Sequence, residues 1–205
     1  MIFDFTHDIR QPNNVFDILE SNTVIASAQV PEFLKGELQY EGEQYSLQHE
    51  AEDFVRADIC KGQAMFAAVD TDICYTKKFP LSLLPGNSYC FTWMEIGDTK
   101  YNIYEVRFDA GRHFYCVYIG DEQVALIHRM DWNANYTCYA VSRSHALALM
   151  LYCLYLACGE CYNARERQDK DNVGEMTTQR PDAWETKQKA LITKYKPDFI
   201  EKIRD

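Results

Sequence analysis

The segment from Ser144 to Asn163 restricts the fold more than any other part of this sequence. Between Ala146 and Cys158 it reads ALALMLYCLYLAC, thirteen apolar residues in a row. A helix of this composition has no polar face and must be enclosed by other parts of the chain. Ser144 is a suitable N-cap. The thirteen residues span about 20 Å, short of the roughly 30 Å of a bilayer core, so we expect a buried helix and no transmembrane span.

The residues before this helix have the pattern of an antiparallel sheet. Aromatic residues make up 14% of the chain, which suits strands. The candidate strands cover residues 15–20, 23–30, 36–40, 44–50, 63–70, 88–96, 100–108, 113–119, 123–130 and 135–141. Hairpin-type turns are expected at 20–22, 41–43, 109–111 and 120–122, where Gly, Asn or Asp tolerates positive φ. The strands follow one another too closely for crossover helices, which favours antiparallel pairing.

Strands can surround a helix on every side only by closing into a barrel. An antiparallel barrel of about twelve strands leaves a lumen wide enough for one helix, and closure removes exposed edges. The sequence therefore predicts a mainly β fold: a closed antiparallel β-barrel of about 12 strands around one central hydrophobic C-terminal helix, plus an α-helical tail. The barrel and its helix are assigned to residues 1–163 and the tail to residues 164–205. Because the helix fills the lumen, any site is expected on the outer surface or the rim.

The tail combines a polar stretch with an amphipathic helix. Residues 165–180 read as a linker, and Pro181 is typical of a first helical turn. Trp184, Leu191 and Tyr195 are spaced by seven and four, which places them on one helical face. This stripe docks on the outside of its own domain, or it binds a partner, a second subunit or a membrane surface. The three residues are the predicted partner-binding site.

Residues 100–160 carry a resemblance to a known family. They read KYNIYEVRFDAGRHFYCVYIGDEQVALIHRMDWNANYTCYAVSRSHALALMLYCLYLACGE, a series of hairpins followed at once by the apolar helix. This layout resembles the tubby C-terminal superfamily, which includes the LURP-one-related proteins and phospholipid scramblases. The resemblance covers residues 1–163 loosely and implies a barrel fold. It also implies binding of phosphoinositides or membranes, as some members do, but no functional residue carries over because no motif position matches.

Charge and cysteine content limit the partners and the compartment. The net charge is −10, and residues 1–164 hold 11 Lys and Arg against 22 Asp and Glu. So acidic a body is repelled by nucleic acid and by anionic lipid unless its cations cluster, and we expect no nucleic-acid partner. Most of the eight cysteines lie in apolar runs, and the N-terminal residues MIFDFTHDIR lack the apolar core of a signal peptide. We therefore expect reduced thiols and a cytoplasmic protein.

Cys158 and Cys161 form a CxxC motif with three open interpretations. A redox pair uses a helix N-terminus to lower the thiol pKa, whereas this pair lies toward the C-terminal end of the apolar helix. Zinc needs two more ligands, and only Cys153 and His145 lie on the same helix. Structural thiols are the favoured interpretation, over a metal site or redox activity. No metal or other cofactor is predicted.

Two acidic motifs are also weak. Asp131 and Asn133 begin a pattern like a calcium loop, but Tyr136 and Ser142 replace its glycine and closing glutamate, so a hairpin turn is favoured. Asp70 and Asp72 place two carboxylates on one face, which favours a solvated turn over a catalytic pair.

The histidines and the basic residues show no clustering in the sequence. No HxH or HExxH pattern occurs, and His145 is interpreted as a capping or core-rim residue, with a buried switch as the alternative. The only adjacent basic pair in the body is Lys77-Lys78, and Arg107, Arg112 and Arg129 fall on separate strands or turns. A solvated scatter of cations is favoured over a lipid-headgroup site.

Three functions stay open. The first is a non-catalytic binding or scaffold domain of the tubby and LURP-one type, which recognises phospholipid headgroups or a protein partner at its outer surface. The second is an enzyme with a surface-groove active site of carboxylates and His113 or His128. The third is a structural protein that oligomerises through the tail. Clustered cations would favour lipid, whereas a pocket with a convergent acid and histidine would favour the enzyme.

Overall fold

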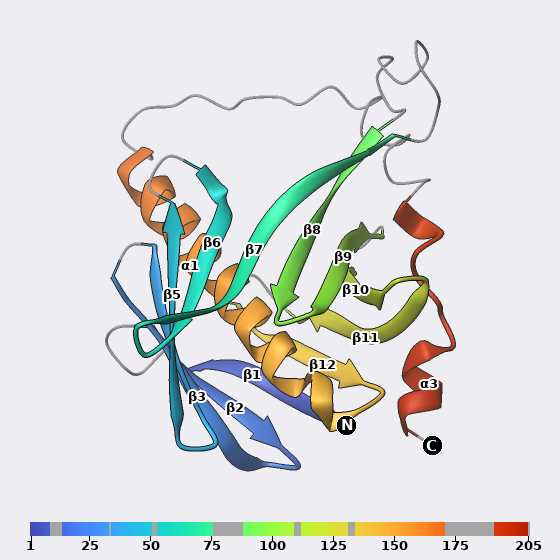
Figure 1. Cartoon of the computed structure of the whole chain (residues 1–205), viewed down its shortest axis with the longest axis horizontal. Coiled ribbons are helices and arrows are strands. Elements are labelled where there is room, and N and C mark those ends of the chain that lie inside the picture. The colour runs from blue at the N-terminus through green and yellow to red at the C-terminus, as the bar shows by residue number, and fades with distance from the viewer. Residues whose placement is uncertain are drawn as a thin grey trace.

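Twelve strands of the described residues close into one antiparallel barrel around a helix. The computed structural model describes residues 1–8, 14–32, 34–50, 53–75, 88–108, 112–130, 134–170 and 191–204. The strands are β1 (Ile2–Asp8), β2 (Val15–Glu20), β3 (Thr23–Glu32), β4 (Lys35–Tyr40), β5 (Glu43–Glu50), β6 (Asp53–Lys61), β7 (Ala64–Tyr75), β8 (Ser88–Ile96), β9 (Thr99–Arg107), β10 (His113–Ile119), β11 (Glu122–Arg129) and β12 (Tyr136–Ala140). Each strand pairs with its neighbour in sequence, and β1 pairs with β12 to close the barrel (Figure 1). The predicted fold class is confirmed.

Two strands, β1 and β6, were not among the ten expected from the sequence. Both alternate cleanly between the two faces: Phe3 and Phe5 of β1 are buried, as are Ala57 and Ile59 of β6. Polar residues such as Asp4 occupy the outward positions, so the period of two is present in the sequence and could have identified both strands. The other ten strands lie where the sequence predicts them, and the bounds of β8 and β10 agree with the prediction.

Three of the four predicted turns lie among the described residues and are confirmed. Ser21 and Asn22 have φ of 51° and 64°, and Glu41 and Gly42 have φ of 49° and 79°. Positive φ at both central residues matches the twist of the flanking strands in a tight hairpin. Gly120, between β10 and β11, has φ of 57°. The fourth predicted turn, 109–111, lies outside the described residues.

The apolar segment forms α1 (Ala146–Lys170), which begins after a 3-10 turn, η3 (Arg143–His145). The predicted N-cap, Ser144, lies inside this turn; the cap is Ser142, whose hydroxyl accepts a hydrogen bond from the Ser144 N–H at 3.2 Å. The helix also runs seven residues beyond the predicted end at Asn163. Good helix formers such as Arg, Glu and Gln dominate this extension, so the start of the predicted linker is helical.

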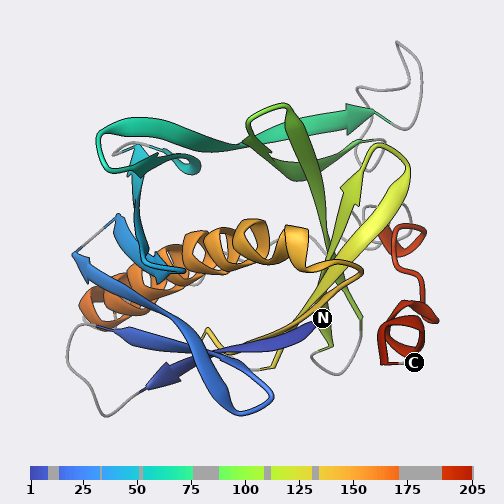
Figure 2. The same cartoon turned by 60° about the horizontal axis from the view of Figure 1, so that its bottom comes forward.

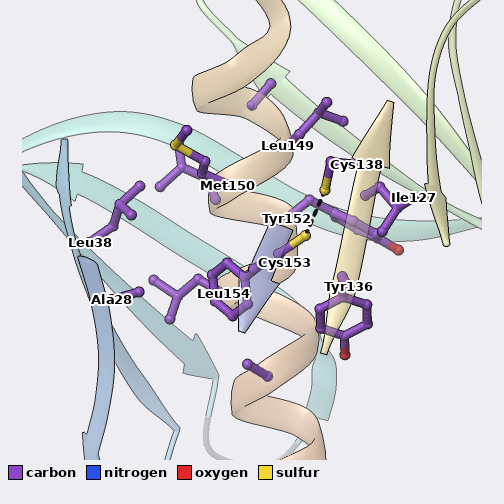
Figure 3. Close-up of a cluster of buried hydrophobic side chains, with 14 of the residues drawn as sticks. Ala28, Leu38, Ile127, Tyr136, Cys138, Leu149, Met150, Tyr152, Cys153 and Leu154 are labelled. Carbon is purple, nitrogen blue, oxygen red and sulfur yellow. Dashed lines mark hydrogen bonds between the residues drawn. The ribbon is translucent and has the colours of Figure 1, made fainter. Parts of the chain in front are cut away.

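The barrel encloses the apolar part of α1 on opposite sides (Figure 2). Leu154 points toward Ala28 of β3, while Cys153 faces Cys138 of β12 with the two sulfur atoms 3.5 Å apart (Figure 3). The buried residues of the helix are Ala146, Ala148, Leu149, Met150, Leu151, Tyr152, Cys153, Leu154, Ala157 and Cys158. By length and composition alone, Arg143–Cys161 could cross a membrane. In this structure the lumen of the barrel buries it instead.

Gly36 of β4 is where the helix comes closest to the wall. A Cβ placed on Gly36 would lie 2.7 Å from Cδ1 of Leu154 and 2.9 Å from Sγ of Cys158. Real Cβ atoms do not approach heavy atoms this closely, so only glycine lets α1 take this position.

Gly36→Ala is therefore expected to lower the free energy of unfolding by about 1–3 kcal/mol, the usual cost of overpacking a core. Urea denaturation followed by intrinsic fluorescence measures it. The control is Gly159→Ala in α1, where a new Cβ meets no heavy atom within 4 Å. The control should be neutral or stabilising by up to about 1 kcal/mol, because alanine is the better helix former. Equal stability of Gly36→Ala and the wild type would contradict the close approach.

Candidate functional site

The inner face of β9, β10 and β11 changes from apolar to charged toward one end of the barrel. On β9 the inward residues Tyr101 and Ile103 belong to the core, and Glu105 and Arg107 follow at the same spacing of two. On β11 the core residue Ile127 is followed by Arg129. The apolar part of the helix does not fill this end. The lumen is therefore polar at this rim.

A pocket of about 280 Å³ lies at the polar rim, between α1 and the barrel wall. We call it the rim pocket. The wall contributes His49, Thr92, Glu105, Arg107, Tyr115 and Arg129, and the helix contributes Tyr152, Tyr155, Leu156, Gly159 and Glu160. The helical residues recur at the spacings that share one helix face. At Gly159 the missing side chain leaves the space open.

Strand register places two arginines and a histidine in one row across the rim. His113 of β10 is the register partner of Arg107 on β9 and of Arg129 on β11. One step further into the barrel, Tyr115 is the register partner of Glu105. Because β10 lies between β9 and β11, Tyr115 stands between the two arginine-bearing strands.

Glu105 neutralises one side of this row. Its Oε1 accepts hydrogen bonds from Nε of Arg107 at 2.9 Å and from Nε2 of His113 at 2.5 Å. Burial alone would raise the pKa of Glu105, but the His113 hydrogen bond and the Arg107 charge outweigh it, so the pKa lies below its ordinary value. Glu105 is therefore ionised at neutral pH.

Glu160 of α1 neutralises the other side. Its Oε1 lies 2.9 Å from Nη2 of Arg129 and accepts a hydrogen bond from the Tyr136 hydroxyl at 2.7 Å. The Arg129 and Glu160 side chains are only 11% and 18% exposed. Removing one partner of so buried a pair leaves an uncompensated charge, so this pair fixes the helix against the wall.

The tyrosines of the rim pocket are neutral hydrogen-bonding groups. Burial raises the pKa of the lining residues Tyr115 and Tyr152 well above the usual value, and it does the same for Tyr136, which donates its hydrogen bond to Glu160. Tyr115 is only 5% exposed, and no described residue hydrogen-bonds its hydroxyl, which faces the pocket. Behind it, Tyr155 stacks between Tyr152 and His49, with ring centroids 5.5 and 4.9 Å away. The pocket thus has an aromatic floor beneath a polar rim.

The structure groups basic residues that the sequence separates. Arg107 and Arg129 lie on separate strands, as expected, and both line the rim pocket, with side chains 43% and 11% exposed. Arg112 lies elsewhere, with its guanidinium 5.4 Å from the Phe108 ring centroid. Lys77-Lys78 lies outside the described residues.

Glu105, Tyr115 and Glu160 are not among the residues that the sequence predicts for a site. A detectable signal existed for the first, because Glu105 and Arg107 continue the inward period of Tyr101 and Ile103. No pattern indicated that Glu160 would meet Arg129. That contact depends on the rotation of the helix inside the barrel.

The remaining motifs do not converge on a second site. Burial raises the pKa of Cys158, and it raises the pKa of Cys161 to about 11, so both thiols stay protonated. None of the eight cysteines is disulfide-bonded.

Asp70 and Asp72 lie within strand β7, not in the predicted turn. Each carboxylate accepts a hydrogen bond from the next backbone N–H at 2.7 Å. Among the described residues, no three His, Cys, Asp or Glu side chains are grouped to hold a metal.

The other residues singled out from the sequence lie away from the rim pocket or outside the described residues. His145 is at the opposite end, where its Nδ1 lies 3.3 Å from the Tyr101 hydroxyl and burial lowers its pKa. His128 points outward and stacks on Phe114, with ring centroids 4.5 Å apart. Asp131 and Asn133 lie outside the described residues.

The tail packs on the outside of the barrel. Its described part is residues 191–204, which include a short helix, α3 (Phe199–Arg204), that contacts β12 (Figures 1 and 2). The wall beneath presents an outer aromatic face of Tyr89, Tyr104, Val106, Phe114, Cys116, Tyr118, Leu126 and Tyr139. Leu191 and Phe199 are buried against it, and the Tyr118 hydroxyl donates a hydrogen bond to the Lys194 carbonyl at 2.6 Å.

Two of the three predicted partner-binding residues thus make contacts within the chain. Leu191 is 8% exposed, and Tyr195 packs on Phe108 and Phe114 with centroids 5.0 and 4.8 Å away. Trp184 lies outside the described residues. Partner binding by this stripe stays a prediction.

Phe199→Ala is expected to lower the free energy of unfolding by about 3 kcal/mol and to increase binding of a hydrophobic dye, because the outer aromatic face loses its cover. Urea denaturation and dye fluorescence measure the two effects. The control, Ile192→Ala, removes a side chain that is 41% exposed and should stay within about 0.5 kcal/mol of the wild type. If Phe199→Ala kept full stability but lost an oligomeric state in light scattering, the subunit-interface interpretation would be favoured instead.

Glu105 gives a pH-dependent contribution to stability. A carboxylate whose pKa is lowered on folding stabilises the fold above its unfolded pKa and loses that contribution as pH falls through its folded pKa. Glu105→Gln should therefore be less stable than the wild type at pH 7, and the difference should shrink below about pH 5. Denaturation curves at a series of pH values measure it. The exposed Glu95→Gln on β8 should show a smaller effect, and a constant deficit in Glu105→Gln would refute the ionic interpretation.

Comparison with protein-family models, with curated proteins and with solved structures gives no match. The resemblance to the tubby superfamily therefore rests on layout alone.

Proposed function

We propose that this protein is a non-catalytic binding domain with the layout of tubby and LURP-one-related proteins, and that the rim pocket is its ligand site. The observation that carries the proposal is the Tyr115 hydroxyl. Tyr115 is only 5% exposed, no described residue hydrogen-bonds its hydroxyl, and the residue lines a pocket of about 280 Å³ between two ion pairs. A hydroxyl that has no partner among the described residues is available to donate a hydrogen bond to a ligand and to accept one from it. The volume lies just below the usual range for small-molecule pockets.

The titration behaviour of the rim pocket supports binding over catalysis. A general acid or base works best with a pKa near the operating pH. The pKa of Glu105 is instead lowered, which keeps it ionised, and the pKa values of Tyr115 and Tyr152 are raised, which keeps them protonated. These groups are suited to fixed hydrogen bonds and charges.

An enzyme is the second candidate, and one observation favours it. Glu105 and His113 hydrogen-bond each other beside a pocket, which is the convergence of acid and histidine expected of an active site. A phospholipid headgroup at the outer surface is less well supported. In the rim pocket, Glu105 and Glu160 offset the positive charges of Arg107 and Arg129. The body as a whole carries a strong negative charge, which repels anionic lipid. The unbridged cysteines agree with the proposed cytoplasmic location.

Filling the rim pocket tests the proposal. Gly159→Leu places a side chain in open space, so we expect it to fold normally, with a small gain in helix propensity. A library of neutral, cationic, anionic and zwitterionic fragments is screened against the wild type by ligand-observed NMR. We expect a set of fragments that bind the wild type and Gly159→Ala but not Gly159→Leu.

Two outcomes would refute the rim pocket as the ligand site. One is that every bound fragment still binds Gly159→Leu, and the other is that no fragment binds the wild type. Sedimentation with anionic vesicles, run on the same three proteins, tests the headgroup alternative, because binding to an outer surface would be unaffected by Gly159→Leu. Turnover of a bound fragment by the wild type would favour the enzyme.

A further inference from the structure

We infer that the ligand of the rim pocket is a small zwitterion that carries a carboxylate and an ammonium group, such as a free amino acid. The inference rests on the proposed function and adds the chemical class of the ligand. It follows from how the charges of the pocket are arranged, from the Tyr115 hydroxyl between them and from the volume.

Among the described residues that line the pocket, the charged side chains balance one another. Arg107 and Arg129 supply two positive charges, and Glu105 and Glu160 supply two negative charges. Each arginine lies beside a glutamate, with nitrogen-to-oxygen distances of 2.9 Å in both pairs. A lone anion that approached either arginine would also meet the adjacent carboxylate, and a lone cation would meet the adjacent guanidinium. A ligand with both charges is attracted at both of its ends.

The two pairs lie on either side of Tyr115. Glu105 and Arg107 are on β9, whereas Arg129 is on β11 with Glu160 facing it from the helix. The Tyr115 hydroxyl lies between them and can both donate and accept a hydrogen bond. A tyrosine hydroxyl is protonated at neutral pH and burial raises its pKa further, so it is a suitable donor to a ligand carboxylate held by an arginine. The ligand ammonium would then face a glutamate of the opposite pair.

The volume of the pocket is comparable to that of a small molecule. About 280 Å³ corresponds to about nine water molecules at roughly 30 Å³ each. A free amino acid has a comparable number of non-hydrogen atoms. The rings of Tyr152 and Tyr155 and the side chain of Leu156 give an apolar surface for a short aliphatic side chain.

The acidic body does not oppose this ligand. A zwitterion has no net charge, so the overall charge of −10 neither attracts nor repels it at long range. At physiological salt, charges separated by more than about 8 Å are screened in any case. The charges that decide binding are those within the pocket.

Three probes of nearly equal shape test the class by isothermal titration calorimetry. Leucine is a zwitterion, N-acetylleucine is an anion and leucinamide is a cation. We expect leucine to bind the wild type at least about tenfold more tightly than either derivative. Each derivative carries only one charge, so it is attracted to the pocket at one end only. Binding should be lost in Gly159→Leu and retained in Gly159→Ala.

Charge variants should change the preference in opposite directions. Glu105→Gln gives the pocket a net positive charge and should shift the preference toward N-acetylleucine. Arg107→Gln gives it a net negative charge and should shift the preference toward leucinamide. The control is Arg112→Gln, which removes a nearby guanidinium outside the pocket and should leave the order unchanged. A purely structural role of these residues would weaken all three probes equally.

Tyr115→Phe should weaken leucine binding about threefold to tenfold, the contribution of one hydrogen bond. The matched control is Tyr101→Phe, an inward tyrosine of β9 at the opposite end of the barrel. Equal effects of the two substitutions would count against Tyr115 as a ligand contact.

The outcomes separate this inference from the proposed function. One outcome is that leucine does not bind, or that a derivative binds as tightly, while the binding of other fragments is lost in Gly159→Leu. The zwitterionic ligand is then refuted, and the rim pocket remains supported as a ligand site. If leucine and all fragments bind independently of Gly159→Leu, or do not bind, both are wrong.

Discussion

The fold depends on one constraint, which is that the apolar part of α1 has no side that can face water. Strands that form an open sheet would cover one side of it, and only a closed sheet covers all of them. Closure requires β1 to pair with β12, and it requires the wall to leave room for the helix, as at Gly36. The position of the helix then decides where the lumen is filled and where space remains. The rim pocket exists because the helix presents Gly159 and Glu160 to the wall after its last fully buried turn.

On strands β9, β10 and β11, side chains point alternately into the barrel and out of it, and each face makes a different set of contacts. The inward residues Glu105, Arg107 and Tyr115 line the pocket, and the outward neighbours Val106 and Phe114 belong to the face that the tail covers. Both faces are therefore needed to hold these strands in place. The tail fixes the outside, and the Arg129 to Glu160 pair fixes the inside. The rim pocket lies on a part of the wall that is supported from both sides.

Much of the fold was predictable because its cause is local in the sequence. An uninterrupted apolar helix needs cover on all sides, and closely spaced strands can give it by closing into a barrel. Ten strands followed from short apolar or alternating runs separated by turn residues. The extension of α1 to Lys170 was missed because polarity was taken as a sign of a linker, although the residues are good helix formers. The pocket was missed for another reason. The contact between Arg129 and Glu160 depends on strand register and on helix rotation, and neither is encoded in a spacing along the chain.

The closure of the barrel sets the order in which the protein can form on the ribosome. Ile2 of β1 pairs with Tyr139 of β12, and the amine of Met1 donates a hydrogen bond to the Ala140 carbonyl at 2.9 Å. One edge of β1 therefore has no partner until nearly all of the barrel has been synthesised. The helix that fills the lumen follows still later. Until then the growing sheet has an unpaired edge and an unoccupied apolar concave face, which is the condition under which chains associate wrongly. Contacts of such high sequence separation also fold slowly. The nascent chain is thus the state of this protein most exposed to aggregation and most in need of chaperones.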